Sequence, residues 1–198
     1  MAVTQIDLLR HGEVEGGSAF NGSSDAPLTQ QGLAQMQRAS AADCAWNRVI
    51  TSPLQRCTVF ADAFAQRHGL PLQRDERLQE IHFGAWEGRS SAAIWNETPA
   101  ALERFWADPE TYPPPGGESL SRFRSRVMGA WNDIIEGYQG ERLLVVTHGG
   151  VIRLLLCHVR GWPLSRLLQI EVEHGALFRI TVDADGVPRC GVDGEGAL

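Results

Sequence analysis

Two short apolar runs, each ending in a His-Gly pair, most constrain what this chain can fold into. The first covers residues 6–9, apart from Asp7, and is followed by Arg-His-Gly at 10–12. The second covers residues 143–146 and is followed by Thr-His-Gly-Gly at 147–150. Short apolar runs that stop at turn residues and precede helical patterns are typical of buried strands in a parallel sheet. The sequence therefore predicts an α/β fold with helices on both faces of the sheet.

Further segments fit this architecture. A strand is expected at residues 48–50, and residues 177–182 with the segment around Val187 indicate an antiparallel hairpin. Thr29 is a suitable N-cap, and Pro53 suits the first turn of a helix. The expected helices cover residues 29–42, 53–68, 119–138 and 151–159. We therefore predict a three-layer α/β/α sandwich with a mostly parallel sheet and an antiparallel edge strand.

The middle of the chain, about residues 81–118, differs from the rest in composition. It is rich in aromatic residues and ends in a Pro/Gly segment at 112–117. Short helices are expected over residues 90–96 and, opened by Thr-Pro, over residues 98–107. We interpret this section as an insertion over the active-site edge of the sheet, within a single domain that spans residues 1–198.

The basic residues limit the chemistry that the chain can perform. The sequence contains 18 basic residues, all of them arginine. The lack of lysine excludes a P-loop lysine, a Schiff-base lysine and a lysine general base. A net charge of −6 and a pI near 5.5 argue against nucleic acid or an anionic membrane as a partner. Any anionic ligand must therefore bind in a local pocket of positive charge.

Cysteine spacing and hydropathy bear on the cellular compartment. Cys44, Cys57, Cys157 and Cys190 form no CxxC pair and no zinc-ribbon pattern. We interpret them as buried reduced thiols, which are typical of the cytosol. The first residues show no signal peptide, and no apolar run approaches the length of a membrane span. A cytoplasmic protein is expected.

Polar residues follow three predicted strands at the points where those strands end. Arg10 and His11 follow the first strand, Ser52 and Arg56 follow the second, and His148 follows the third. Ligands of open parallel sheets bind outside the carboxyl ends of the strands, so these side chains would share one edge. Guanidinium groups bind phosphate oxygens in pairs, and helix N-termini offer free N–H groups to an anion. The pattern predicts a phosphate pocket.

His11 is the candidate nucleophile of this pocket. Imidazole is neutral near pH 7 and forms covalent intermediates. Attack on phosphorus would give a phosphohistidine, with its charge held by Arg10, Arg56 and a protonated His148. Glu80, directly before the aromatic segment, is the best candidate to protonate the leaving alkoxide. Each residue alone is more often structural, and the combination is what favours phosphoryl transfer.

The remaining histidines lack such a context, and we interpret all four of them as structural: His68, His82, His158 and His174. No HExxH or similar compact ligand spacing is present, and the arginine beside His11 would repel a cation. Neither a metal nor another cofactor is expected.

Five motifs occur in order along the chain. They read LRHGE at 9–13, PLTxxG at 27–32, SPLxR at 52–56, ExxFGxWEG at 80–88 and VTHGG at 146–150. This pattern resembles the histidine phosphatase superfamily, the phosphoglycerate mutase-like fold, over about residues 5–155. The resemblance implies that His11 is phosphorylated and that Glu80 donates the proton. It also implies that Arg10, Arg56 and His148 complete the phosphate pocket. Independently of the resemblance, Gly149 directly after His148 lets the backbone approach a bound ligand closely.

The chain departs from the family pattern at one position. Many members carry an asparagine six residues after the nucleophile, where this sequence has Gly17. Asn21, or a nearby backbone N–H such as that of Gly22, would have to supply the substrate contact.

Within the superfamily, the sequence is most similar to α-ribazole phosphatases, which act in cobalamin nucleotide-loop assembly. Trp86, Trp95 and Trp106 could stack on a flat base or simply seal the insertion against the sheet. The alternatives are a broad-specificity phosphatase, a phosphoglycerate mutase, or an inactive regulatory module on the same fold. The expected partner is a small phosphate ester, and the sequence leaves a homodimer open.

Overall fold

A computed structural model describes residues 3–41 and 45–190 of the 198-residue chain. Its centre is a six-stranded sheet with the order β3-β2-β4-β1-β5-β6. The strands are β1 (Thr4–Arg10), β2 (Arg48–Thr51), β3 (Leu72–Arg74), β4 (Arg142–Thr147), β5 (Leu177–Val182) and β6 (Pro188–Cys190). Strands β1 to β4 pair in parallel, whereas β5 pairs antiparallel with both β1 and β6. The predicted parallel sheet with an antiparallel edge is confirmed.

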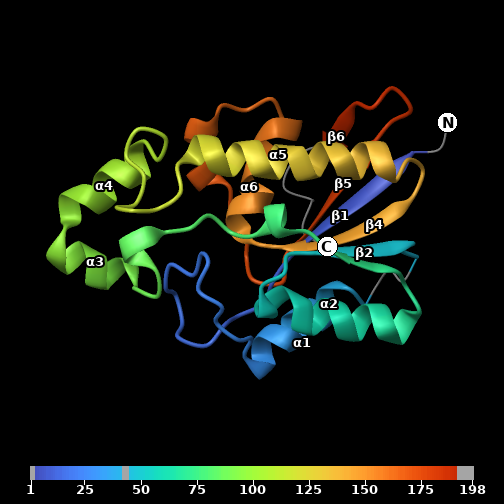
Figure 1. Cartoon of the computed structure of the whole chain (residues 1–198), viewed down its shortest axis with the longest axis horizontal. Helices are drawn as coiled ribbons and strands as arrows, with labels where there is room; N and C mark the ends of the chain where they lie inside the picture. Colours follow the sequence, from blue (N-terminus) through green and yellow to red (C-terminus); the bar gives the residue numbers. More distant parts are fainter. Residues whose placement is uncertain (1–2, 42–44, 191–198) are drawn as a thin grey trace.

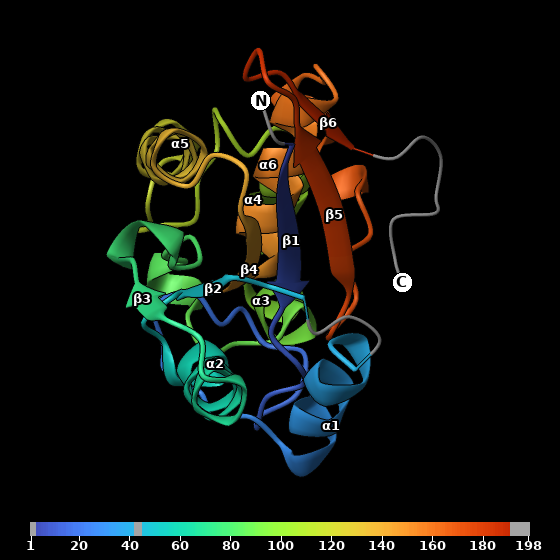
Figure 2. The same cartoon turned by 90° about the vertical axis from the view of Figure 1, so that its right-hand side faces the viewer.

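Helices cover both faces of this sheet (Figures 1 and 2). They are α1 (Gln30–Ala39), α2 (Gln55–His68), α5 (Leu120–Gly137) and α6 (Gly149–Val159). Ile6 and Leu8 of β1 pack in a core with α5 and α6, whereas Leu9 packs in a second core with α1 and α2. This division follows from the alternation of side chains along a strand. The three-layer sandwich is confirmed.

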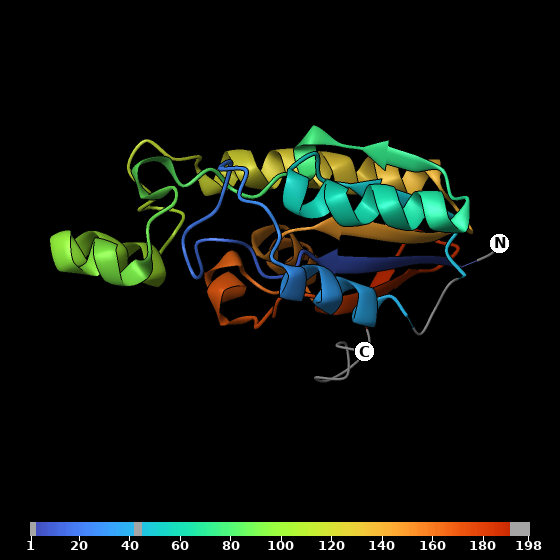
Figure 3. The ribbon, with the colours of Figure 1, turned by 90° about the horizontal axis from the view of Figure 1, so that it is seen from below.

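The insertion lies beyond the carboxyl ends of the parallel strands (Figures 1 and 3). It contains the 3-10 helix η2 (Gly84–Trp86) and the helices α3 (Ser91–Glu97) and α4 (Pro99–Ala107). These elements share a small core of Trp86, Ile94, Leu102 and Phe105. Phe20, from the loop after β1, packs against the same core. The loop that follows the first strand is thus tied to the insertion.

Several predicted boundaries differ from the structure. Helix α1 ends at Ala39, and Ala42 lies outside the described residues. Helix α2 begins at Gln55 instead of at Pro53, because Leu54 is still in an extended conformation and forms the N-cap. The 3-10 helices η1 (Glu76–Leu78) and η3 (Leu164–Gln169) and strand β3 were not predicted, since segments this short carry little periodicity.

The cysteine prediction is confirmed in part. Cys57 and Cys157 are buried free thiols, Cys190 is a free thiol that is only half-buried, and Cys44 lies outside the described residues. Among the helices that the structure describes, none is both long and apolar enough to cross a membrane.

Candidate active site

A cavity of about 320 Å³ lies between the carboxyl ends of the parallel strands and the insertion. Four of the residues predicted from the sequence line it: Arg10, His11, Asn21 and Glu80. Arg56 and His148 do not line the cavity, because both side chains are completely buried. The predicted residues therefore lie close together, but only the first four face the cavity, whereas Arg56 and His148 are buried behind it.

His11 directly follows β1, and its backbone N–H donates to the carbonyl of Thr147 across to β4 at 2.9 Å. Its Nδ1 lies 2.8 Å from the carbonyl oxygen of Gly12. Because a carbonyl only accepts, Nδ1 carries the proton and Nε2 keeps its lone pair. Burial, followed by the charges of Arg56 and Arg10, lowers the pKa of His11 well below its usual value. The site thus holds a neutral imidazole with an unprotonated Nε2.

His148 follows β4 and lies behind His11, with ring centroids 5.2 Å apart. Its Nδ1 accepts from Nε of Arg56 at 3.2 Å, so its Nε2 carries the proton and donates to Oγ of Ser52 at 2.7 Å. Burial first, and then the charge of Arg56, lowers the pKa of His148 well below its usual value. The imidazole is therefore neutral in this structure, whereas the protonated His148 expected from the sequence belongs to the phosphorylated state and stays a prediction.

Arg10 supplies a positive charge at the edge of the cavity. Its Nη1 donates to the carbonyl of Val172 at 2.6 Å, and its Nη2 donates to Nε2 of His174 at 3.0 Å. Its Nε is buried and has no hydrogen-bond partner among the described residues. Burial lowers the pKa of Arg10 to about 10, which leaves it cationic at neutral pH. An unpartnered buried donor is costly, so this N–H is a natural contact for an anion.

Gly149, predicted to bind the substrate, supports Arg10 instead. A Cβ at this position would lie 3.3 Å from Nε of Arg10 and 3.0 Å from Nη1 of Arg153. Gly149 itself does not line the cavity. The missing side chain leaves room for two guanidinium groups at the start of α6.

Arg56 holds the loop at residues 21–24 from behind. Its Nη2 donates to the carbonyls of Asn21 and Gly22 at 3.0 and 2.6 Å, and its Nη1 donates to that of Ser24 at 2.7 Å. The N–H of Gly22 donates to Glu87, so it does not face a substrate. The prediction that Gly22 binds substrate is wrong, because its N–H is already paired within the protein.

Glu80 lies at the start of α6. Its Oε2 accepts from the backbone N–H of Gly150 at 2.9 Å, and its Oε1 accepts from that of Ile81 at 3.0 Å. A Cβ at Gly150 would lie 2.2 Å from Oε1 of Glu80, so only glycine permits this approach. The carboxyl group is thus held against a helix N-terminus while it lines the cavity.

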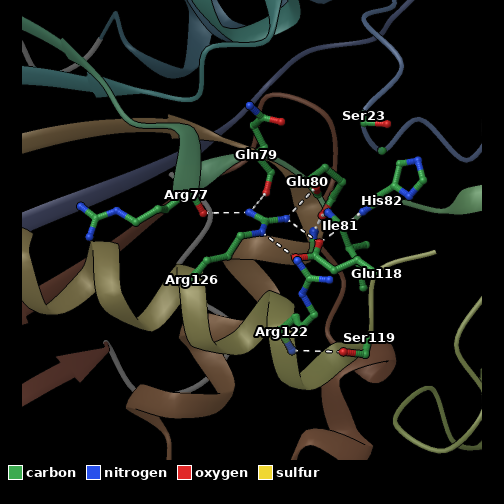
Figure 4. Close-up of polar contacts among 12 residues, drawn as sticks. Ser23, Arg77, Gln79, Glu80, Ile81, His82, Glu118, Ser119, Arg122 and Arg126 are labelled. Atoms are coloured by element: carbon green, nitrogen blue, oxygen red, sulfur yellow. Dashed lines mark hydrogen bonds and ion pairs between the residues drawn. The ribbon is translucent and has the colours of Figure 1, made fainter. Parts of the chain in front are cut away.

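Arg126 of α5 fixes the backbone that carries Glu80 (Figure 4). Its Nη1 donates to the carbonyls of Arg77 and Gln79 at 2.8 and 2.6 Å, and its Nη2 donates to that of Glu80 at 2.9 Å. The same guanidinium pairs with both carboxylate oxygens of Glu118 at 2.8 Å. The backbone of Glu80 is therefore held in place by Arg126 and its ion pair with Glu118, which lie outside the cavity.

Two titratable side chains of the cavity were not predicted from the sequence as site residues. His174, interpreted as structural, lines the cavity with its ring 5.6 Å from that of His11. Burial, followed by the charge of Arg10, lowers the pKa of His174 to about 4. Arg153 also lines the cavity from α6. Its spacing of four residues from Gly149 places both on one helix face, a signal that could have found it, whereas His174 lies in a loop without any such pattern.

Most of the cavity wall is apolar. Trp86 is buried in the core of the insertion, and Trp95 is exposed and stacked on Trp106 with centroids 6.1 Å apart. Of these three predicted stacking residues, only Trp106 lines the cavity. The other apolar lining residues are Val14, Ala19, Phe20, Ile81, Phe83, Phe105, Pro109, Leu120, Phe123, Leu167 and Leu168. The cavity thus combines a charged floor with walls suited to a flat, apolar group.

The neutral, buried histidines predict a pH dependence of stability. The pKa values of His11 and His148 are lower in the folded protein than in the unfolded chain. Their contribution is present above the unfolded value near 6.5 and is lost as pH falls below it. Together with His174, whose pKa is lowered to about 4, they predict that urea titrations at pH 7 and pH 5.5 show a loss of about 3–4 kcal/mol in the free energy of unfolding. His11→Asn, which removes one titrating group, should lose clearly less, and an equal loss would contradict the assignment.

A family model described as the histidine phosphatase superfamily (branch 1) matches residues 6–190. The chain belongs to this superfamily. Among the relatives, a bifunctional protein of Mycobacterium tuberculosis is 33% identical over 91% of this chain, which spans only 48% of that protein. An adenosylcobalamin/α-ribazole phosphatase of Salmonella typhimurium is 27% identical over 88% of this chain and 89% of its own length. An α-ribazole phosphatase from Shigella flexneri, whose crystal structure is known, shares 26% sequence identity with this chain. The match covers 98% of each chain, with a TM-score of 0.83.

Proposed function

We propose that this protein is a phosphomonoesterase that forms a phosphohistidine at His11. The observation that carries the proposal is the state of this imidazole at the cavity. Its Nδ1–H is committed to the carbonyl of Gly12, which leaves Nε2 as the nucleophilic nitrogen. The unpartnered Nε–H of Arg10 supplies a donor for a phosphate oxygen beside it. Membership of the histidine phosphatase superfamily supports the same chemistry.

The reaction then has two steps. Nε2 of His11 attacks phosphorus, the ester P–O bond breaks, and Glu80 gives its proton to the leaving oxygen. In the second step, Glu80 takes a proton from water, which attacks the phosphohistidine and releases inorganic phosphate. Arg10 and Arg56 stabilise the negative charge of the transferring group. The protonated His148 expected from the sequence would have to give up its hydrogen bond from Nε of Arg56, because a protonated Nδ1 cannot accept.

We propose α-ribazole phosphate as the substrate. The apolar walls suit an aromatic base, with Trp106 as the stacking residue, and two α-ribazole phosphatases are similar over nearly the whole chain. Apart from Arg10, Arg153 is the one arginine among the described residues that line the cavity. We also propose that residues 1–198 act as one domain in the cytoplasm, without a metal. The single sheet supports this organisation.

A screen of phosphate esters tests this function. The panel contains α-ribazole phosphate, phosphosugars, nucleotides and 3-phosphoglycerate, each with EDTA present, and both free phosphate and isomers are measured. We expect phosphate release throughout, with kcat/KM for α-ribazole phosphate at least about 10-fold above that for 3-phosphoglycerate. Isomer formation with little free phosphate would instead indicate a mutase, and loss of activity in EDTA would indicate a metal enzyme.

Trp106→Ala is the variant that tests the aromatic part of the proposal. It should raise KM for α-ribazole phosphate about 10-fold by removing the stacking partner. Trp162→Ala is a matched control, because Trp162 is also partly exposed but lies outside the cavity. Equal effects of the two variants would contradict stacking on Trp106.

A further inference from the structure

The carboxylate of Glu87, in the insertion, accepts hydrogen bonds from the backbone of the loop at residues 21–24. Its Oε2 accepts from the N–H groups of Gly22 and Ser24 at 3.1 and 3.0 Å. Its Oε1 accepts from those of Ser23 and Phe83 at 3.0 and 2.8 Å. Although burial opposes ionisation, the hydrogen bonds from Phe83 and the loop hold the pKa of Glu87 below its usual value. The carboxylate is therefore a stable anion that satisfies four backbone donors.

Arg56 binds the same loop from the opposite side. It donates to the carbonyls of Asn21, Gly22 and Ser24, while the N–H groups of residues 22–24 point to Glu87. An anion at the N–H ends and a cation at the C=O ends of these peptide groups both favour the same orientation of their dipoles. The loop is thus clamped between opposite charges, neither of which lines the cavity.

The clamp leaves no free space at Gly22. A Cβ at this position would lie 2.2 Å from the carbonyl oxygen of Ile81 and 2.3 Å from Oε1 of Glu87. Phe20 adds a second link, because its N–H donates to the carbonyl of Arg89 and its carbonyl accepts from Gly88, both at 2.9 Å. The loop after β1 and residues 83–90 of the insertion therefore hold one fixed relative position.

We infer that Glu87 is a positioning residue, which acts through the loop at residues 21–24 to set the guanidinium of Arg56 against His148 and the phosphate pocket. This inference rests on the proposed function, because it requires Arg56 to stabilise the transferring phosphoryl group. The Nη atoms of Arg56 donate to the loop carbonyls while its Nε donates to Nδ1 of His148. Displacement of the loop therefore shifts a buried cation whose charge acts on His11, although neither Glu87 nor Arg56 lines the cavity.

The test is a double-mutant cycle with p-nitrophenyl phosphate as the probe. Glu87→Gln keeps the size of the side chain but turns an NH₂ group toward backbone donors. We expect it to lower kcat/KM about 30-fold and to weaken inhibition by vanadate in parallel. In an Arg56→Ala background, the same substitution should cost less than about 2-fold, because the group that it positions is gone. A full 30-fold loss in that background would overturn the inference.

Controls separate this inference from the proposed function. Glu103→Gln removes an exposed carboxylate of α4 in the same insertion and should leave kcat/KM unchanged. Should Glu87→Gln fail to fold by circular dichroism, the same cycle is run with Glu87→Asp, which keeps the charge. An active Arg56→Ala variant would contradict the proposed role of Arg56 itself. If the double variant loses kcat/KM by the product of the two single losses, only the positioning role of Glu87 is contradicted.

Discussion

His11→Ala is expected to lower kcat/KM for every phosphate ester by at least about 10⁴-fold, because it removes the group proposed to form the covalent intermediate. The fold should persist, since the imidazole makes one side-chain hydrogen bond, to the adjacent Gly12. The direct measurement is a rapid quench of the wild-type enzyme during turnover of a ³²P-labelled ester. Label should appear on His11, be lost in acid and survive in base, and be missing in His11→Ala.

His174 is the rival acceptor, because its ring also borders the cavity, 5.6 Å from that of His11. Its Nε2 is already paired with Nη2 of Arg10, whereas Nε2 of His11 has no partner among the described residues. His174→Ala should therefore retain the label, although its turnover will fall because Arg10 loses a contact. His82→Ala, at an exposed histidine outside the cavity, should behave as the wild type. Label on His174, or no label at all, would refute the proposed nucleophile.

The sequence brought the candidate site residues together because parallel strands align their carboxyl ends. The register that pairs Arg10 of β1 with Thr147 of β4 places the next residues, His11 and His148, side by side. Three predicted strands, each followed by a polar residue, were therefore enough to place these polar side chains at one edge of the sheet. The insertion was recognisable because its aromatic residues and its Pro/Gly segment interrupt the alternation of strands and helices.

What escaped prediction depends on contacts between distant parts of the chain. His174 reaches the cavity from the loop before β5, and only the buried guanidinium of Arg10 explains its position. The contacts of Arg56 with the carbonyls of residues 21–24 depend on a loop without secondary structure. The neutral state of His148 follows from complete burial, which no local pattern encodes. The local patterns thus indicate which candidate groups share one edge of the sheet but not which contacts hold them there.

Glu80→Gln is expected to separate substrates by their leaving groups. The amide can still accept from Gly150, so the local structure should hold, but it cannot give a proton to a leaving oxygen. For α-ribazole phosphate, whose leaving group is a strongly basic alkoxide, kcat/KM should fall about 10²–10⁴-fold. For p-nitrophenyl phosphate, kcat/KM should change less than about 10-fold, since p-nitrophenolate departs without protonation.

The same variant also tests whether Glu80 acts as the base in the second step. Since kcat/KM reports only the events up to phosphorylation, slow hydrolysis of the phosphohistidine would lower kcat alone. Stopped-flow traces of Glu80→Gln with p-nitrophenyl phosphate should therefore show a burst of one p-nitrophenol per site, followed by a slow steady state. Glu76→Gln, at an exposed carboxylate four residues earlier that does not line the cavity, should show neither effect. Equal losses in kcat/KM for both esters, without a burst, would mean that the proton reaches the leaving group from another residue, and the carboxyl group beside Gly150 would then serve only to cap α6.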